Sequence, residues 1–262
     1  MALPDINEKD RLLRLFSDTM RDAGIYSDTF EDVYRWTSDD EYPYDDDLNG
    51  ILCEYDVQVC SGASKIVFKF WEESQWVFKV PLLGESWRED DESPEYYDYF
   101  SNIARNFDFS EDASYDRPDE DCCDYCELEA YVGSYVSEHY SDIAEMFAMT
   151  YYIGTYGHTP IYVSERCDTT WTDVYNDVVS TPDFQAHLSN SRTPQWNSSH
   201  RTAELTVDTK VALDMSWGEA AVSKLCQLIT DIGITDIHGG NLAYDERGKL
   251  RLIDYSGYCI AS

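Results

Sequence analysis

Hydrophobic residues near the N-terminus recur at the spacing of an amphipathic helix. From residue 4 to about residue 24, apolar side chains are separated by charged ones so that they fall on one side of a helix. These apolar side chains are Leu12, Leu13, Leu15, Phe16 and Met20. The pattern predicts a helix here, followed at residues 25–49 by a loop rich in tyrosine and aspartate.

Three strand signals follow this loop. Apolar and polar residues alternate from residue 50 to residue 60, and two further runs at 66–71 and 75–82 are rich in β-branched and aromatic residues. Short turns of small or polar residues separate the three runs. We therefore expect an antiparallel meander in this part of the chain.

From residue 84 onward, the pattern predicts more residues in helices than in strands. An acidic, tyrosine-rich insertion at 84–121 precedes a helix from Cys122 to about His139. The later predicted elements are a strand at 160–164, helices at 171–179 and 217–232, and strands at 242–244 and 250–253. A turn at 245–248 joins the last two strands into a hairpin.

The charge of the chain restricts its partners. Its 262 residues include 52 acidic and 19 basic side chains, which give a formal net charge of −33. This charge repels nucleic acid and anionic membranes, and no basic patch offsets it, so we expect neither as a partner. The acidity fits a solvated, self-repelling surface, with adaptation to a saline habitat as the alternative. Because no signal segment or bilayer-length apolar run occurs, we expect a cytoplasmic protein with free thiols.

The C-terminal segment contains the candidate chemistry. A predicted helix ends near Gly233, and the run Asp236-Ile-His-Gly-Gly-Asn241 then leads into the hairpin, which ends at Asp254. Because a hairpin returns the chain to its starting point, the side chains of Asp236, Asn241 and Asp254 can converge. Carboxylate and amide oxygens suit Mg²⁺ bound to nucleotide phosphates. Asn241 and Asp254 are the predicted metal ligands, and Asp236 is the predicted base that accepts a hydroxyl proton.

The pattern Asp-x-His-x-x-Asn, a hairpin and Asp-x-x-Gly resembles the catalytic and metal-binding loops of the protein-kinase-like superfamily. With its histidine two residues after the aspartate, the motif is similar to that of aminoglycoside phosphotransferases. It also resembles the motif of small kinase-like proteins of bacteria and their phages. The resemblance implies ATP and Mg²⁺ (or Mn²⁺) as cofactors. It also implies an α+β, two-lobed fold, with an antiparallel N-lobe sheet and a truncated, mostly helical C-lobe.

The same resemblance divides the chain into three parts. Residues 1–49 would be a helical and acidic extension, and 50–165 an N-lobe that carries the acidic insertion. Residues 166–262 would be a minimal C-lobe with the catalytic and metal loops. The chain ends five residues after Gly257, without the later segments with which protein kinases bind peptides. We therefore expect the acidic insertions at 84–121 and 168–210 to recognise any protein substrate.

The N-terminal half offers matching nucleotide-binding residues. A small-residue turn at the first bend of the meander would let backbone N–H groups approach phosphate, although it has one glycine instead of the three typical of protein kinases. Its members are Ser61, Gly62, Ala63 and Ser64. Lys79, in the run Trp-Val-Phe-Lys-Val-Pro, is similar to the Val-Ala-Ile-Lys strand of the family and would bridge the α- and β-phosphates.

A lysine on an apolar strand needs an anionic partner, because burying an unpaired charge is costly. We expect this partner on the helix at 122–139, where Glu127 borders the apolar face and is preferred to Glu129. Lys69, one strand earlier, is the alternative to Lys79, but it is predicted to face solvent. In the resemblance, residues 161–167 take the position of the fifth strand and the hinge, so the backbone near Glu165 would meet the edge of the adenine base.

Three functions remain open. The chain has a residue for each chemical position: the lysine, the glutamate, the catalytic aspartate with its asparagine, and the metal-binding aspartate. This favours an active kinase. Its first expected substrate is a protein hydroxyl and its second a small molecule, and transfer of AMP is the further alternative. The second is a pseudokinase-like binding module whose acidic surface engages a basic partner. The third is a structural domain in which both motifs are coincidental.

Overall fold

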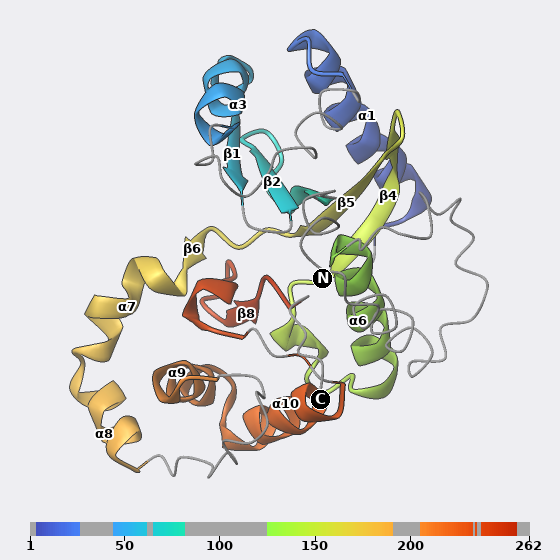
Figure 1. Ribbon diagram of the computed structural model, residues 1–262. Helices are drawn as coiled ribbons and strands as arrows, with labels where there is room; N and C mark the ends of the chain where they lie inside the picture. The colour runs from blue at the N-terminus through green and yellow to red at the C-terminus, as the bar shows by residue number, and fades with distance from the viewer. Residues whose placement is uncertain are drawn as a thin grey trace, which may run out of the picture. The chain divides into compact units, whose positions relative to one another are not determined.

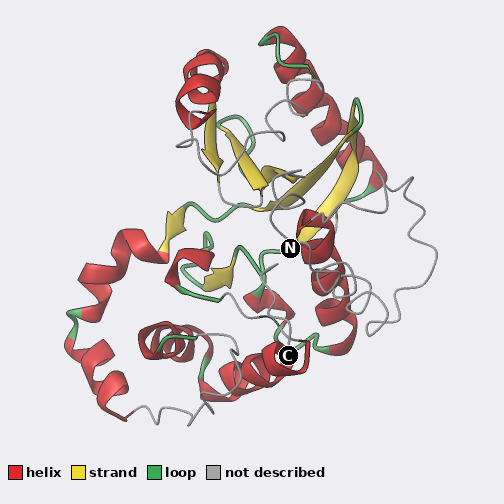
Figure 2. Cartoon of the chain, viewed as in Figure 1, coloured by secondary structure: helices red, strands yellow, loops and turns green. Residues whose placement is uncertain are grey.

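The computed structural model describes residues 4–26, 44–61, 65–81, 125–190, 205–232, 234 and 237–255. The chain forms two compact units, one from Met1–Ala130 with Thr150–Glu165, and the other from Tyr131–Met149 with Arg166–Ser262. The structure is mixed α+β with a five-stranded antiparallel sheet and several helices, which confirms the predicted class at this level (Figures 1 and 2). The predicted insertion at 84–121 lies outside the described residues.

The first unit is built on the five-stranded sheet, in which every neighbouring pair of strands is antiparallel. The strands are β1 (Val57–Ser61), β2 (Lys65–Phe70), β3 (Trp76–Pro81), β4 (Thr150–Tyr156) and β5 (Thr159–Glu165). Their order is β1-β2-β3-β5-β4, so the predicted meander forms one side of the sheet. The predicted strand at 160–164 is β5, which lies between β3 and the edge strand β4.

One face of this sheet is apolar and is covered by α1 (Ile6–Asp22). The helix begins after Asp5, whose side chain accepts a hydrogen bond from the backbone N–H of Glu8 at 2.9 Å. The ring of Phe16 lies 5.5 Å from that of Phe68 on β2 and 5.4 Å from that of Phe78 on β3. The predicted N-terminal helix is therefore confirmed, and its apolar stripe belongs to the core of the sheet.

The segment before β1 differs from the prediction. Helix α3 (Tyr44–Leu52) and the 3₁₀ turn η1 (Cys53–Tyr55) occupy residues for which the sequence predicted the end of a loop and the start of a strand. Leu48 and Leu52 are both buried, and their spacing of four residues places them on one side of a helix. The strand begins only after Asp56, whose positive φ of 56° ends the turn.

Helix α6 (Tyr125–His139) spans the division between the units and corresponds to the helix predicted at 122–139. The second unit contains a small sheet with the strand order β6-β7-β8. Its elements are η2 (Ala144–Met146), β6 (Thr169–Thr170), α7 (Trp171–Val179), α8 (Pro182–Asn190), α9 (Val207–Trp217), α10 (Glu219–Ile232), η3 (Gly239–Asn241), β7 (Leu242–Tyr244) and β8 (Leu250–Leu252). The predicted helices at 171–179 and 217–232 and the C-terminal hairpin are confirmed, whereas α8 and α9 were not predicted.

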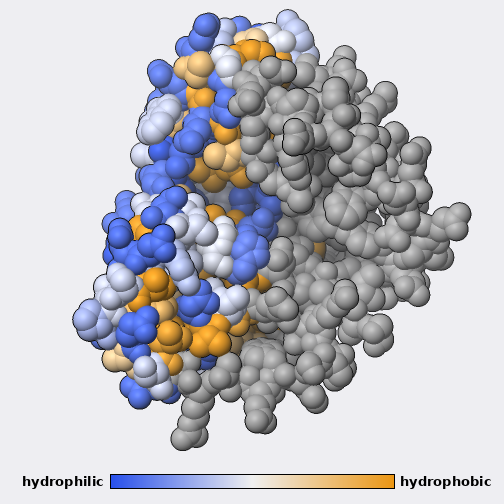
Figure 3. All heavy atoms as spheres, turned by 60° about the vertical axis from the view of Figure 1, so that its left-hand side comes forward, coloured by the Kyte–Doolittle hydropathy of each residue, from blue (hydrophilic) through white to orange (hydrophobic). Residues whose placement is uncertain are grey.

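The surface of the described residues mixes polar and apolar side chains. Figure 3 shows hydrophilic and hydrophobic residues interspersed on one side of the molecule. Large exposed apolar side chains, such as Ile6 of α1 and Met215 of α9, occur on several elements, as is normal for a protein surface. Among the described helices, none combines the length and the apolar character needed to cross a bilayer.

Candidate functional site

Lys79 lies on the face of the sheet opposite the Phe16 core. It pairs with Val67 of β2 and Tyr162 of β5, whereas the preceding Phe78 points into the apolar core. The Lys79 ammonium is buried and donates a hydrogen bond of 2.6 Å to Oε2 of Glu129. The predicted lysine therefore has a carboxylate partner, and the two groups form a buried ion pair.

The preference for Glu127 as this partner is wrong, because the carboxylate that meets Lys79 belongs to Glu129. Glu129 is fully buried, whereas Glu127 is only partly buried. The buried stripe of α6 includes Val132 and Val136, which lie three and seven positions after Glu129. Tyr131, one turn after Glu127, is only partly buried, so its side of the helix is not the innermost one.

Lys65, a residue that sequence reasoning placed in a turn, is a second buried lysine at the same carboxylate. It opens β2, and its ammonium forms an ion pair with Oε1 of Glu129. Lys65 precedes Val67 by two residues, and Val67 is opposite Lys79, so both lysines extend from the same face of the sheet. The sequence signal was present in the alternation of β2, but it could be used only once the register was known.

A hydroxyl from the edge strand β4 completes the group around Glu129. The Oγ1 atom of Thr150 on β4 donates to Oε2 of Glu129 at 2.9 Å. Thr150 pairs with Ser164, which lies two positions after Tyr162 on β5, so the register places Thr150 on the same face as Lys79. The first unit thus has one apolar face and one face with a buried polar cluster of Lys65, Lys79, Glu129 and Thr150.

Other predicted residues of the first unit lie elsewhere on the sheet or outside the described residues. Ser61 is the last residue of β1 and pairs with Ile66, whereas 62–64 lie outside the described residues. Glu165 is the buried last residue of β5 and pairs with Trp76. Lys69 is partly buried on β2, and by alternation it shares the face of Lys65.

In the second unit, the Asp-x-His-x-x-Asn motif forms a compact turn from His238 onward. Its Asp236 lies outside the described residues. Nδ1 of His238 accepts a hydrogen bond of 3.0 Å from the backbone N–H of Gly240, and the backbone oxygen of His238 accepts one of 2.9 Å from Asn241. The histidine thus caps the single turn η3 and fixes the approach to Asn241.

Both glycines of this motif have a steric reason. A Cβ atom on Gly239 would lie 2.7 Å from Cδ1 of the buried Trp171 ring, and one on Gly240 would lie 2.8 Å from Cε1 of His238. These separations are too short for unstrained carbon contacts. A side chain at position 239 would therefore meet the buried Trp171 ring, whereas the exposed His238 side chain could move away from one at position 240.

The hairpin brings Asn241 and Asp254 to one end, as the sequence predicted. Leu242 of β7 pairs with Leu252 of β8, and the backbone oxygen of Asn241 accepts a hydrogen bond of 2.9 Å from Ile253. Asp254 is the next residue, so an amide side chain and a carboxylate lie at neighbouring backbone positions. Asn241 is buried and Asp254 is half-buried.

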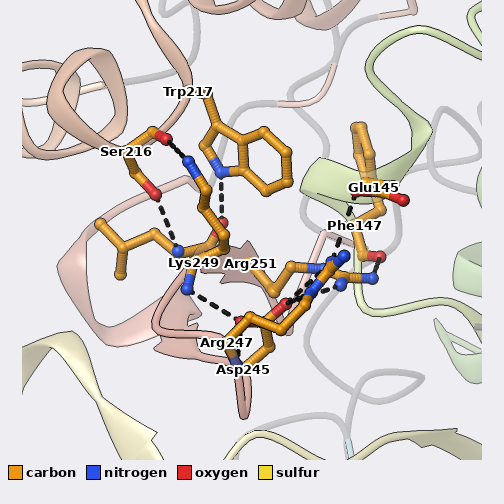
Figure 4. Close-up of polar contacts among 9 residues, drawn as sticks. Glu145, Phe147, Ser216, Trp217, Asp245, Arg247, Lys249 and Arg251 are labelled. Atoms are coloured by element: carbon orange, nitrogen blue, oxygen red, sulfur yellow. Dashed lines mark hydrogen bonds and ion pairs between the residues drawn. The ribbon is translucent and has the colours of Figure 1, made fainter.

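A charged network at the opposite end of the hairpin holds this geometry (Figure 4). Asp245 accepts hydrogen bonds from the side chains of Arg247 and Arg251 and from the backbone N–H groups of Arg247 and Lys249. Arg251 also donates to the backbone oxygen of Phe147 at 2.9 Å. Burial works in the opposite direction, but these hydrogen bonds, first that from the Lys249 backbone, hold the pKa of Asp245 below its usual value.

The donor set at Asn241 and Asp254 suits one divalent cation together with phosphate oxygens, because both residues offer hard oxygen ligands. Among the described residues, no group of three or more histidine, cysteine, aspartate or glutamate side chains could hold a metal ion. Comparison of the chain with models of known protein families, with curated proteins and with solved structures found no match.

Proposed function

We propose that the protein is an ATP- and Mg²⁺-dependent phosphotransferase with a protein-kinase-like fold, acting on a protein hydroxyl. The observation that carries this proposal is the buried ion pair between Lys79 of β3 and Glu129 of α6. In protein kinases a lysine of the third strand pairs with a glutamate of the following helix and positions the nucleotide phosphates. Here too, the helix follows the third strand in the chain.

The burial of this pair favours a functional origin. A buried ion pair contributes little to stability on average, because the cost of removing both charges from water offsets their attraction. Two apolar side chains of similar size would fill this face of the sheet without that cost. The fixed, dry geometry of Lys79 instead suits a group that must present its charge to phosphate.

The C-terminal motif supplies the remaining roles in the proposal. Asp236 would accept the proton of the attacking hydroxyl, while Asn241 and Asp254 would hold Mg²⁺ on the phosphates. The metal would neutralise charge that develops on the transferred phosphoryl group. The shared hairpin end of Asn241 and Asp254 supports this assignment, because the two ligands need neighbouring positions.

The test is transfer of label from ATP. The purified chain is incubated with Mg²⁺ or Mn²⁺ and with ATP labelled at the γ- or the α-phosphate, alone and with a cell lysate. We expect γ-label on protein, and a loss of about 100-fold or more for Asp254→Ala. Glu246→Gln, which removes an exposed carboxylate from the same hairpin, is the matched control and should transfer normally.

The other outcomes separate the alternative functions. Transfer of α-label in place of γ-label would show an AMP transferase that uses the same nucleotide-binding groups. No transfer of either label under any metal would refute the enzyme. It would then favour a kinase-like binding module whose charge of −33 engages a basic partner.

A further inference from the structure

The loop that carries Asn241 lies against the ring of Trp171, the first residue of α7. A Cβ atom added to Gly239 would lie 2.7 Å from Cδ1 and 3.3 Å from Nε1 of this ring. The backbone at position 239 therefore packs directly on one edge of the indole, without the space that a side chain would need. Asn241 is two residues further on, in the same single turn. A displacement of Gly239 would therefore also move Asn241.

The strand that follows the loop fixes the place of Trp171. Strand β6 pairs with β7, and Thr170 lies opposite Ala243, two residues after Asn241. The side chain of Thr170 also caps the first turn of α7, which begins at Trp171. The segment 170–171 thus meets the loop and its strand twice, once through backbone pairing just after Asn241 and once through the indole at Gly239.

Three neighbouring aromatic rings restrict the movement of the Trp171 ring. Ring centroids lie 5.8 Å away for Tyr175, 6.2 Å for Phe184 and 6.5 Å for Tyr244. The indole N–H of Trp171 is buried and has no hydrogen-bond partner in the part of the chain that the structure describes. A buried N–H without a partner costs free energy, so this group contributes nothing to the stability of the aromatic cluster. It lies on the edge of the ring that faces position 239.

We propose that Trp171 is a positioning residue of the metal site, because its indole fixes the backbone at Gly239 and thereby keeps Asn241 in place to bind Mg²⁺. This inference rests on the proposed function, in which Asn241 and Asp254 hold the metal. Residues that orient metal ligands without touching the metal typically change metal affinity or activity by about 10–100-fold when they are replaced. Replacing Trp171 should therefore lower metal affinity as well as the stability of the fold.

Trp171→Phe tests this role with two measurements. Electron paramagnetic resonance follows the binding of Mn²⁺ in the presence of a non-hydrolysable ATP analogue, and transfer of γ-label is measured over a range of Mg²⁺ concentrations. We expect the Mn²⁺ affinity to fall about tenfold and the Mg²⁺ concentration for half-maximal transfer to rise about tenfold. Transfer at saturating Mg²⁺ should return to within about threefold of the wild type, because excess metal compensates for weaker binding.

A second substitution addresses the same contact from the loop. Gly239→Ala should also weaken Mn²⁺ binding, because the added Cβ must displace the loop or the indole. The smaller ring of Trp171→Phe has room to move away from this Cβ, so the double variant should bind Mn²⁺ more tightly than the product of the two single losses predicts. Losses that multiply would show that the ring and position 239 do not act on each other, and would overturn the inference.

Val222→Ala is the control for stability, because it removes part of a fully buried apolar side chain from α10 in the same unit. It should lower the thermal midpoint and leave Mn²⁺ affinity unchanged. Circular dichroism checks that each variant folds, and if Trp171→Phe does not, Gly239→Ala takes its place in both measurements.

The outcomes separate this inference from the proposed function. If the wild type transfers label, but Trp171→Phe loses transfer equally at every Mg²⁺ concentration and keeps its Mn²⁺ affinity, Trp171 has a structural role and only this inference is overturned. If the wild type neither binds Mn²⁺ with the analogue nor transfers label, the proposed function fails together with the inference.

Discussion

Replacing Glu129 with glutamine should destabilise the protein more than any other single change in the polar cluster. The substitution preserves the shape of the side chain but removes the negative charge that two buried lysines share. Removing one partner of a buried ion pair costs about 3–5 kcal/mol, because the remaining charge stays buried without compensation. Here two ammonium groups would remain on one face of the sheet, so we expect the upper half of this range.

The assay is urea unfolding followed by circular dichroism, in which the free energy of unfolding of Glu129→Gln is compared with that of the wild type. Glu127→Gln on the same helix is the matched control, because its side chain is only partly buried. It should change stability by less than about 1 kcal/mol. Equal losses for the two variants would refute our assignment of Glu129 as the carboxylate at the centre of the cluster.

A double variant tests whether Lys65 and Glu129 interact energetically. Adding Lys65→Met to Glu129→Gln removes one of the two lysine charges that lose the Glu129 carboxylate. The double variant should therefore be more stable than Glu129→Gln alone, with a coupling energy of about 1–3 kcal/mol. Additive losses would mean that Lys65 and Glu129 do not interact energetically, despite their contact in the structure.

Three further predictions concern packing and the hairpin. Phe16→Ala should lower the free energy of unfolding by about 3–5 kcal/mol, because the ring packs against three other phenylalanine rings in the sheet core; urea unfolding measures this. Gly239→Ala should lower the thermal midpoint and reduce phosphoryl transfer, because the added Cβ would lie 2.7 Å from the Trp171 ring. Asp245→Asn should destabilise the protein at pH 7. Because the pKa of Asp245 is lowered in the folded state, its contribution is present above the unfolded-state pKa of about 3.9 and is lost as pH falls through the folded-state value. The stability difference between Asp245→Asn and the wild type should therefore shrink below about pH 4 in acid titrations of unfolding.

The first two of these predictions have a control variant, and the third has an outcome that would contradict it. Ile6→Ala removes an exposed apolar side chain from the same helix as Phe16 and should cost less than about 0.5 kcal/mol. Gly248→Ala tests a different property, because Gly248 has a positive φ of 72° but nothing within 4 Å of an added Cβ. It should affect stability and leave transfer intact. A stability difference for Asp245→Asn that stayed constant from pH 7 to pH 3 would contradict the lowered pKa.

Local patterns predicted the elements whose residues follow a single period. The apolar stripe of α1 and the β-branched and aromatic runs of β2 and β3 lie within one segment each, so local spacing and composition identified them. The C-terminal hairpin was predicted for the same reason, since its turn residues lie between two short apolar runs. Helix α3 was missed because tyrosine and aspartate dominate its sequence, and its two buried leucines give a weak helical signal.

The candidate site was predicted only in part, because it depends on register between strands and on which side of a helix is buried. Lys79 was found from its own strand, but the choice between Glu127 and Glu129 depends on the rotation of α6, which Val132 and Val136 reveal once their burial is known. Lys65 was missed because its position on the polar face follows from the pairing of Val67 with Lys79. A one-residue shift in that register would turn Lys65 toward the Phe16 core, where a charge could not be buried. The charged cluster therefore helps to specify the register of β2 on β3.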